Sequence, residues 1–158
     1  MIEKSFEEYK LSHDIFRKDL LTGKVAIVTG GGSGIGAGIS HSLASLGATV
    51  VIASRKLERV QKAANGLAKL SNGSVHADVC DIRDRESVEG LVKRTLDTHG
   101  RIDILVNNGG GQFLSPAEFI RDKGWDSVVA TNLTGTWNLT KAVAKGWMLK
   151  NGGRIINI

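Results

Sequence analysis

The 158-residue sequence has one cysteine, one proline and few aromatic side chains, and these scarcities narrow what the protein can be. Cys80 cannot form a disulfide within the chain, which fits a reducing compartment. The four histidines lack the spacing of metal ligands, so we expect no metal site. No apolar run approaches the roughly 20 residues of a membrane-spanning helix, and the N-terminus does not read as a secretory signal. We therefore expect an intracellular protein, cytoplasmic by default, with no membrane partner.

The charge balance is basic, with 21 Lys and Arg residues against 16 Asp and Glu residues. Such a balance is typical of proteins that bind nucleic acid, acidic surfaces or small phosphate-bearing ligands. The densest basic cluster, at residues 55–62, has no interleaved aromatic side chains on which the bases of a single strand could stack. We therefore expect no nucleic-acid partner.

Short apolar runs alternate five times with stretches of helical periodicity. The expected strands are Val25–Val28, Thr49–Ala53, Val75–Val79, Ile102–Val106 and Arg154–Ile158, and helical spacing is found at 35–46, 57–68, 88–96 and 128–143. Unbroken apolar runs indicate strands buried on both faces. The pattern predicts an α/β fold, a Rossmann-type doubly wound parallel sheet with helices on both faces. We assign residues 1–22 to a polar lead-in and residues 23–158 to this domain.

A glycine-rich turn joins the first expected strand to the first expected helix. Residues 29–36 read TGGGSGIG, a G-x-x-x-G-x-G spacing rather than the general G-x-G-x-x-G. Glycine permits positive φ and close backbone approach to a ligand, and a helix N-terminus offers unpaired N–H groups to an anion. The turn therefore predicts a phosphate cradle, with an ordinary tight turn as the alternative. The candidate residues are Gly30, Ser33, Gly34, Ile35 and Gly36.

The end of the second expected strand bears on cofactor choice. An Asp or Glu there takes the ribose hydroxyls of NAD, whereas an Arg accommodates the 2′-phosphate of NADP. This sequence has Ser54 and Arg55 at that point and no acid. Arg55 can grip a phosphate through two N–H groups, and Ser54 can donate its hydroxyl. The sequence favours NADP over NAD, with a surface arginine at a helix start as the alternative reading.

Five landmarks then fall in a familiar order. They are TGGGSGIG at 29–36, Asp81 in CDIRD, NNGGG at 107–111, Asn132 in TNLTG and GGRIINI at 152–158. In this order and spacing the sequence resembles the classical short-chain dehydrogenases/reductases from Lys24 to Ile158. The resemblance implies that Asp81 hydrogen-bonds the adenine amine while Ile82 flanks the ring, and that Asn107, Asn108 and Gly109 line the cofactor. It also implies that Asn132, on a locally distorted helix, is the polar active-site residue that holds a proton-relay water.

A narrower resemblance concerns the substrate. The segments NNGGGQFLSPAEFI, KGW and NLTGTWNLTKAV are similar to peroxisomal trans-2-enoyl-CoA reductases and 2,4-dienoyl-CoA reductases. The resemblance implies NADPH-dependent reduction of a 2-enoyl-CoA-type acyl thioester, with the loop at 110–113 near the substrate. That loop could equally be a packed surface loop. Bacterial relatives that oxidise terpenoid alcohols carry a similar loop, so an alcohol or ketone dehydrogenase of a lipid-like substrate is the alternative.

The family's active-site serine and its Tyr-x-x-x-Lys pair are not found in the sequence. The only tyrosine is Tyr9, and Lys141 and Lys145 lie on the preceding helix. We therefore expect the chain to hold the cofactor-binding part of a domain that is truncated after the fifth strand. Alone it is expected to be inactive and prone to self-association. A non-catalytic nucleotide-binding fragment is the further alternative. The resemblance implies a homo-oligomeric parent, with a peroxisomal location possible, although the chain ends without a peroxisomal tripeptide.

Overall fold

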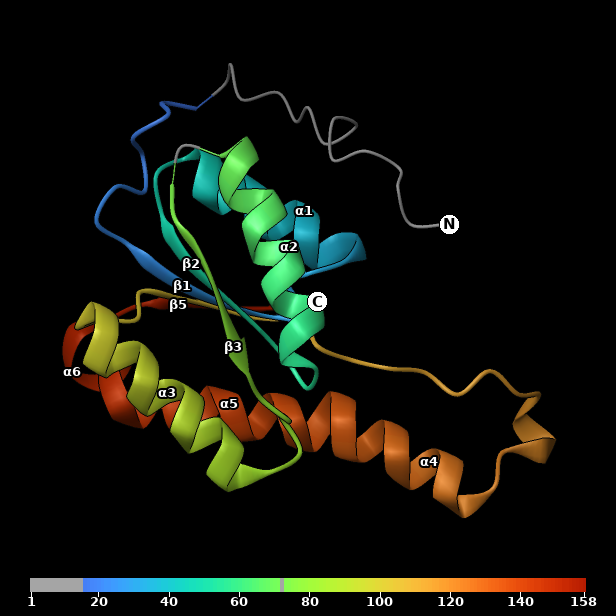
Figure 1. Ribbon diagram of the computed structural model, residues 1–158. Helices are drawn as coiled ribbons and strands as arrows, with labels where there is room; N and C mark the ends of the chain where they lie inside the picture. Colours follow the sequence, from blue (N-terminus) through green and yellow to red (C-terminus); the bar gives the residue numbers. More distant parts are fainter. Residues whose placement is uncertain (1–15, 72) are drawn as a thin grey trace.

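Five parallel strands form one sheet in the computed structural model, which describes residues 16–71 and 73–158. The strand order is β3-β2-β1-β4-β5 (Figure 1). The strands are β1 Val25–Thr29, β2 Thr49–Ser54, β3 Val75–Val79, β4 Ile104–Asn107 and β5 Arg154–Asn157. The chain runs outward in one direction from β1 to β3 and then returns to the other side of β1, which is the doubly wound order. The predicted Rossmann-type sheet is therefore confirmed.

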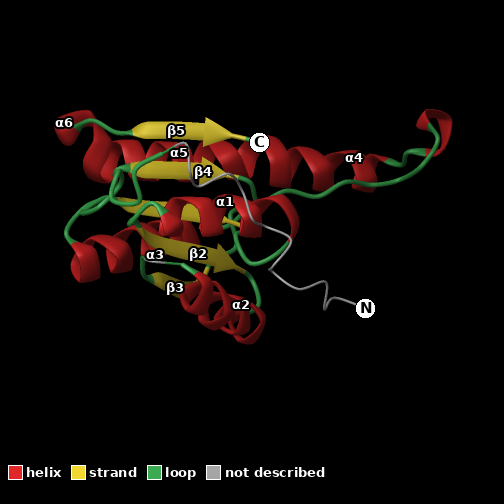
Figure 2. Cartoon of the chain, turned by 90° about the horizontal axis from the view of Figure 1, so that it is seen from above, coloured by secondary structure: helices red, strands yellow, loops and turns green. Residues whose placement is uncertain are grey.

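Helices cover both faces of the sheet (Figures 1 and 2). One face packs on α1 (Gly34–Ser45) and α2 (Leu57–Leu70), whose side chains join β1 and β2 in one apolar core. The other face packs on α3 (Arg85–His99) and α5 (Thr136–Val143), where fully buried Leu91 and Leu139 meet Ile27 of β1. Because the three central strands β1, β2 and β4 contribute alternate residues to two cores, their central residues are apolar. The edge strands differ: β3 is only partly buried, and all four residues of β5 are exposed.

The helix α3 has a capping residue at each end, Asp84 and Gly100. The Asp84 carboxylate accepts a hydrogen bond from the backbone N–H of Glu86 at 3.0 Å, which caps the helix. At the other end, Gly100 takes a φ of 73° and its N–H bonds to the carbonyl of Leu96.

The last helical stretch is longer than expected. It begins at α4 (Asp122–Val128), passes through a π-helical segment (Val129–Gly135) into α5, and continues through a second π segment (Ala144–Met148) to α6 (Leu149–Asn151). The sequence predicted that this helix starts at Val128, because the residues before it form no apolar stripe. In the structure these residues of α4, such as Trp125, are exposed. Figures 1 and 2 show why: α4 and the loop before it, with a 3₁₀ turn at Ala117–Phe119, project away from the sheet.

The fourth strand starts two residues later than predicted, at Ile104 instead of Ile102. Ile102 is fully buried, which explains its apolar character. The next residue, Asp103, is hydrogen-bonded to Val25 at the start of β1. Its N–H donates to the carbonyl of Val25 and its side chain accepts from the N–H of the same residue at 2.9 Å. The division at residue 22 stays a prediction, since residues 1–15 of the lead-in lie outside the described residues. Over the described ranges, no helix combines the length and apolar character needed to cross a bilayer.

Asp103 ties the amino-terminal ends of β1 and β4 together. Besides Val25, its carboxylate accepts from Arg101 Nε at 2.7 Å and Arg101 Nη2 at 2.6 Å, and it lies 3.5 Å from Lys24 Nζ. Burial by itself would raise the pKa of Asp103, but the hydrogen bonds from Arg101 and Val25 and the two positive charges lower it overall. The ionised carboxylate is therefore a stabilising feature.

We expect Asp103→Asn to lower the free energy of unfolding by about 1–3 kcal/mol, because it removes the charged acceptor from three donors. The native contribution is fully present above the unfolded pKa of about 3.9 and is lost as pH falls through the depressed folded pKa. Urea unfolding should therefore show the deficit at pH 7 and a shrinking one below about pH 4. Asp97→Asn, which breaks only an exposed pair with Lys93, is the control. Equal deficits in the two variants would contradict the role of Asp103.

Candidate functional site

A pocket of about 540 Å³ opens at the carboxyl ends of the strands. Its walls follow β1, β2, β3 and β4 in turn, the edge of an open α/β sheet where ligands bind. The lining residues are Thr29, Gly30, Ser33, Ile35, Gly36, Ala53–Arg55, Cys80–Arg83, Asn108–Phe113, Ser127, Val128 and Thr131. Ten of the thirteen residues predicted for the site lie on this wall. The three exceptions are Gly34, which belongs to the same turn, Asn107 and Asn132.

The glycines of the turn have different tasks. Gly36 is required for packing, because a Cβ there would lie 2.4 Å from the carbonyl oxygen of Gly30 and 2.4 Å from Asn108 Nδ2. Gly34 is required for backbone conformation, with a φ of 52°, and a Cβ there would meet no atom within 4 Å. The space beside Gly34 is therefore open at the first residue of α1, where a helix presents N–H groups to an anion. That it binds phosphate stays a prediction.

Hydrogen bonds between Thr29 and the residues after β4 hold the glycine-rich turn against the end of that strand. Thr29 Oγ1 accepts from the backbone N–H groups of Asn108 at 3.1 Å and Gly109 at 2.8 Å, and Asn108 Nδ2 donates to the carbonyl of Thr29 at 2.9 Å. The NNGGG segment thus positions its neighbours as well as bordering the pocket. The site prediction did not include Thr29, although its place at the end of a strand before the turn was a usable signal.

Asn107 lies beneath the pocket instead of on its wall. The side chain is buried, and its Nδ2 donates to Thr140 Oγ1 at 3.0 Å and to Asn157 Oδ1 at 2.9 Å. These bonds join β4 to α5 and β5. Asn107 is therefore not among the residues that line the pocket, and its amide holds the sheet and helix together. That it lines the cofactor stays a prediction.

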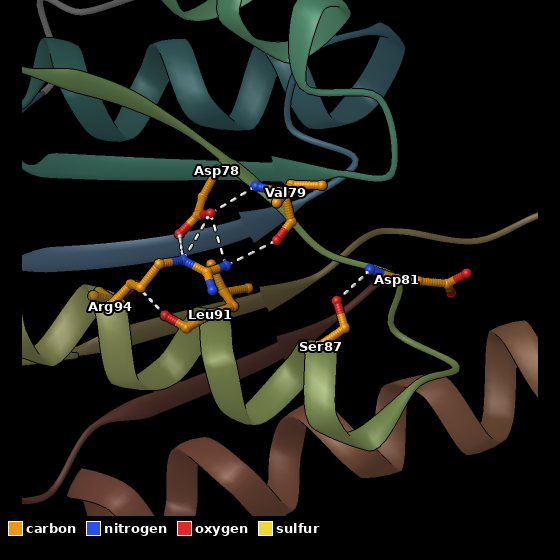
Figure 3. A network of polar contacts seen from close by, with 7 residues as sticks. Asp78, Val79, Asp81, Ser87, Leu91 and Arg94 are labelled. Carbon is orange, nitrogen blue, oxygen red and sulfur yellow. Dashed lines mark hydrogen bonds and ion pairs between the residues drawn. The ribbon is translucent and has the colours of Figure 1, made fainter.

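Asp81 is held on both its backbone and its side chain. Its N–H donates to Ser87 Oγ at 3.0 Å, and Figure 3 shows its carboxylate pointing away from the neighbouring Asp78–Arg94 pair. Arg83 grips that carboxylate through Nε at 2.9 Å and Nη2 at 2.6 Å. The hydrogen bond from the Arg83 side chain is the main reason that the pKa of Asp81 falls to about 2. Asp81 is thus an anion near neutral pH.

Asp81 keeps capacity for a further donor. Its Oδ1 accepts from both the N–H and Nε of Arg83, whereas Oδ2 accepts only from Nη2. A carboxylate oxygen can accept two hydrogen bonds, so Oδ2 can take one from an adenine amine. The next residue, Ile82, packs against the last helical stretch. A Cβ on Gly135 would lie 2.7 Å from Ile82 Cγ1, and Asn138 Nδ2 donates to the Ile82 carbonyl.

Arg83 is a second residue of the site that the sequence did not predict. It lines the pocket and carries a positive charge, but no periodicity or family landmark singles it out. The neighbouring Cys80 is not a nucleophile, because burial raises the pKa of its thiol to about 11.

Ser54 and Arg55 lie where the sequence placed them, at the end of β2 and on the pocket wall. Arg55 is exposed and makes no ion pair with any residue in the described part of the chain. Its charge helps to lower the pKa of Asp81. The two residues follow neighbouring strands, since Ser54 of β2 is in register with Val79 of β3. A free guanidinium there is suited to an anionic ligand.

Asn132 lies in the π-helical segment, which confirms the expected local distortion. Its Oδ1 accepts from the N–H of Gly111 at 2.9 Å, and its Nδ2 donates to the carbonyl of Gly111 at 2.8 Å. This reciprocal pair fixes the loop at 110–113 against the helix. Phe113 adds a second contact, since a Cβ on buried Gly124 would lie 3.1 Å from its ring. That Asn132 holds a proton-relay water stays a prediction.

The comparisons with known proteins agree with this geometry. The sequence model of the family described as short chain dehydrogenase matches residues 24–158. A peroxisomal 2,4-dienoyl-CoA reductase of Danio rerio is 40% identical over 149 residues, which are 94% of this chain and 49% of that protein. The chain therefore spans about half the length of this curated relative.

Solved structures resemble the fold over a similar range. A citronellol catabolism dehydrogenase of Pseudomonas aeruginosa superposes with a TM-score of 0.84 at 45% identity, covering 90% of this chain and 58% of that one. A metagenomic short-chain oxidoreductase in complex with NADP gives a TM-score of 0.78 at 36% identity, covering 87% of this chain and 62% of that one.

Proposed function

The chain belongs to the short-chain dehydrogenase family, and from this premise we propose that it forms the NADP(H)-binding part of a reductase of 2-enoyl-CoA-type thioesters. One observation carries the proposal. A single pocket runs from exposed Arg55, past the glycine turn, to the loop that carries Gln112 and Phe113. The cationic end suits a phosphorylated cofactor, and the apolar end suits the acyl part of a substrate.

The residues present fit such a cofactor. The open space beside Gly34 leaves room for a pyrophosphate at the start of α1, and Arg55 and Ser54 are suited to a 2′-phosphate. Asp81 would take the adenine amine through Oδ2, while Asn108 and Gly109 border the pocket beyond β4. When bound, the nicotinamide would supply the hydride. A metagenomic relative in complex with NADP supports the choice of NADP.

The substrate class is supported at the other end of the pocket. Gln112, Phe113 and Val128 offer one amide and two apolar surfaces, held in place by the bonds between Asn132 and Gly111. The 40% identity to a peroxisomal 2,4-dienoyl-CoA reductase supports an acyl-CoA thioester and a peroxisomal location for the whole protein.

A second candidate has its own support. The structure at 45% identity is a citronellol catabolism dehydrogenase, which favours oxidation of a lipid-like alcohol by the same site. Exposed Leu133 and Trp137 on the last helical stretch, 68% and 58% accessible, support a homo-oligomer in either case.

Spectrophotometry at 340 nm separates the candidates. In its full natural length, the protein should oxidise NADPH with crotonyl-CoA or longer 2-enoyl-CoA and should not reduce NADP⁺ with citronellol. The reverse pattern would favour the alcohol dehydrogenase. A polypeptide of these 158 residues should bind NADPH in calorimetry but turn over at least about 10²-fold more slowly, because its one tyrosine, Tyr9, is not part of a Tyr-x-x-x-Lys pair that could donate the proton. Turnover at the full-length rate would contradict that expectation.

A further inference from the structure

Arg83 is paired with the Asp81 carboxylate, in the part of the pocket proposed for the 2′-phosphate of the cofactor. It forms a two-bond pair with the Asp81 carboxylate, and both residues line the pocket. Arg55, proposed to receive the 2′-phosphate, also lines the pocket, directly after β2, whose last residue Ser54 is in register with Val79 of β3. The neighbouring ends of β2 and β3 therefore bring two guanidinium groups and one carboxylate to this side of the pocket.

This arrangement reduces the repulsion between the Asp81 carboxylate and a bound 2′-phosphate. The Asp81 carboxylate is suited to the adenine amine, but a bare carboxylate would repel a 2′-phosphate bound at the same end of the pocket. The Arg83 guanidinium neutralises that charge at hydrogen-bond distance, with Nη2 2.6 Å from Oδ2. The carboxylate can then stay ionised without disfavouring a phosphorylated ribose.

Arg83 also has donors to spare. A guanidinium carries five N–H groups, and this one uses its Nε–H and one Nη2–H on Asp81. Its Nη1 makes no hydrogen bond to any residue in the ranges 16–71 and 73–158. The Arg83 side chain is 41% accessible, so these donors can reach a ligand.

We infer that Arg83 is a second determinant of specificity for NADP over NAD, which bridges Asp81 and the 2′-phosphate opposite Arg55. The inference rests on the proposed preference for NADP(H). It assigns to Arg83 two effects: it screens the negative charge of Asp81, and it donates to the phosphate. Both effects favour the phosphorylated cofactor and leave the unphosphorylated one unchanged.

The variant Arg83→Gln tests this role without risk to the fold, because an ion pair this exposed adds little to stability. Calorimetry should compare adenosine 2′,5′-bisphosphate with 5′-AMP, and NADPH with NADH. We expect about tenfold weaker binding of the two ligands that carry the 2′-phosphate and less than about twofold change for the other two. The matched control is Arg85→Gln, which removes the same charge two residues on, outside the pocket lining.

The outcomes are distinct. An unmutated protein that binds NADPH and NADH equally would refute the cofactor preference itself. If the unmutated protein discriminates but Arg83→Gln keeps the full discrimination, the role of Arg83 is wrong while the preference stands. Equal weakening of all four ligands would also overturn the inference, because it would make Arg83 only a positioning residue for Asp81.

Discussion

Gly34→Val is expected to weaken binding of NADP(H) by at least about 100-fold while the protein stays folded. Valine at a φ near 52° is strained, and its branched side chain would enter the open space proposed for the pyrophosphate. Strain of this kind costs about 1–3 kcal/mol of stability, so circular dichroism should show a native spectrum with a lower melting temperature. Calorimetry with NADPH measures the loss of affinity.

Gly100→Val provides the control for strain alone. Gly100 has a φ of 73° and open space for a Cβ, as Gly34 has, but it ends α3 away from the pocket lining. This variant should lose similar stability and keep its affinity for NADPH. If Gly34→Val binds NADPH normally, the glycine segment is an ordinary tight turn and the phosphate cradle is wrong.

Arg55→Asp is expected to reverse the cofactor preference. Losing the charge-assisted bonds to the 2′-phosphate should weaken NADPH binding by about 1.5–3 kcal/mol, which is roughly tenfold to 150-fold. The new carboxylate would repel the phosphate further and could accept from the ribose hydroxyls of NAD. Dissociation constants for NADPH and NADH from calorimetry should therefore cross over.

Arg59→Asp is the matched control for net charge. It makes the same two-charge change four residues on, at an exposed position of α2, and Arg59 does not line the pocket. It should shift both dissociation constants by a small factor that disappears at high salt, since exposed charges at this distance are screened. Preference for NADPH that survives in Arg55→Asp would remove Arg55 from the phosphate site.

The parts of the fold that the sequence predicted well depend on local pattern. Apolar runs specify β1, β2 and β4 because both faces of the sheet are covered there, and glycine at positive φ marks the ends of helices. The start of α4 could not be predicted in this way, because that helix projects from the sheet and needs no apolar stripe.

The site residues, too, could be predicted where a local pattern places them and not where distant contacts do. The glycine turn and Arg55 follow strand ends directly, so their position could be read from neighbouring residues. The pairing of Asn132 with Gly111 joins residues 21 positions apart, and the bonds of Asn107 reach 33 and 50 positions, which no local pattern encodes. Arg83 was missed for another reason: its partner is only two residues away, across a turn without periodicity.

The π-helical segment at Val129–Gly135 also sets the rotational phase of the helix that contains it. Each residue of an α-helix turns the chain by about 100°, and a π turn accommodates about one extra residue. The extra residue shifts the angular position of the α4 residues relative to α5, whose Leu139 and Val143 are buried against the sheet. The direction in which α4 and the loop before it face is therefore set by the π segment as well as by the packing of α5.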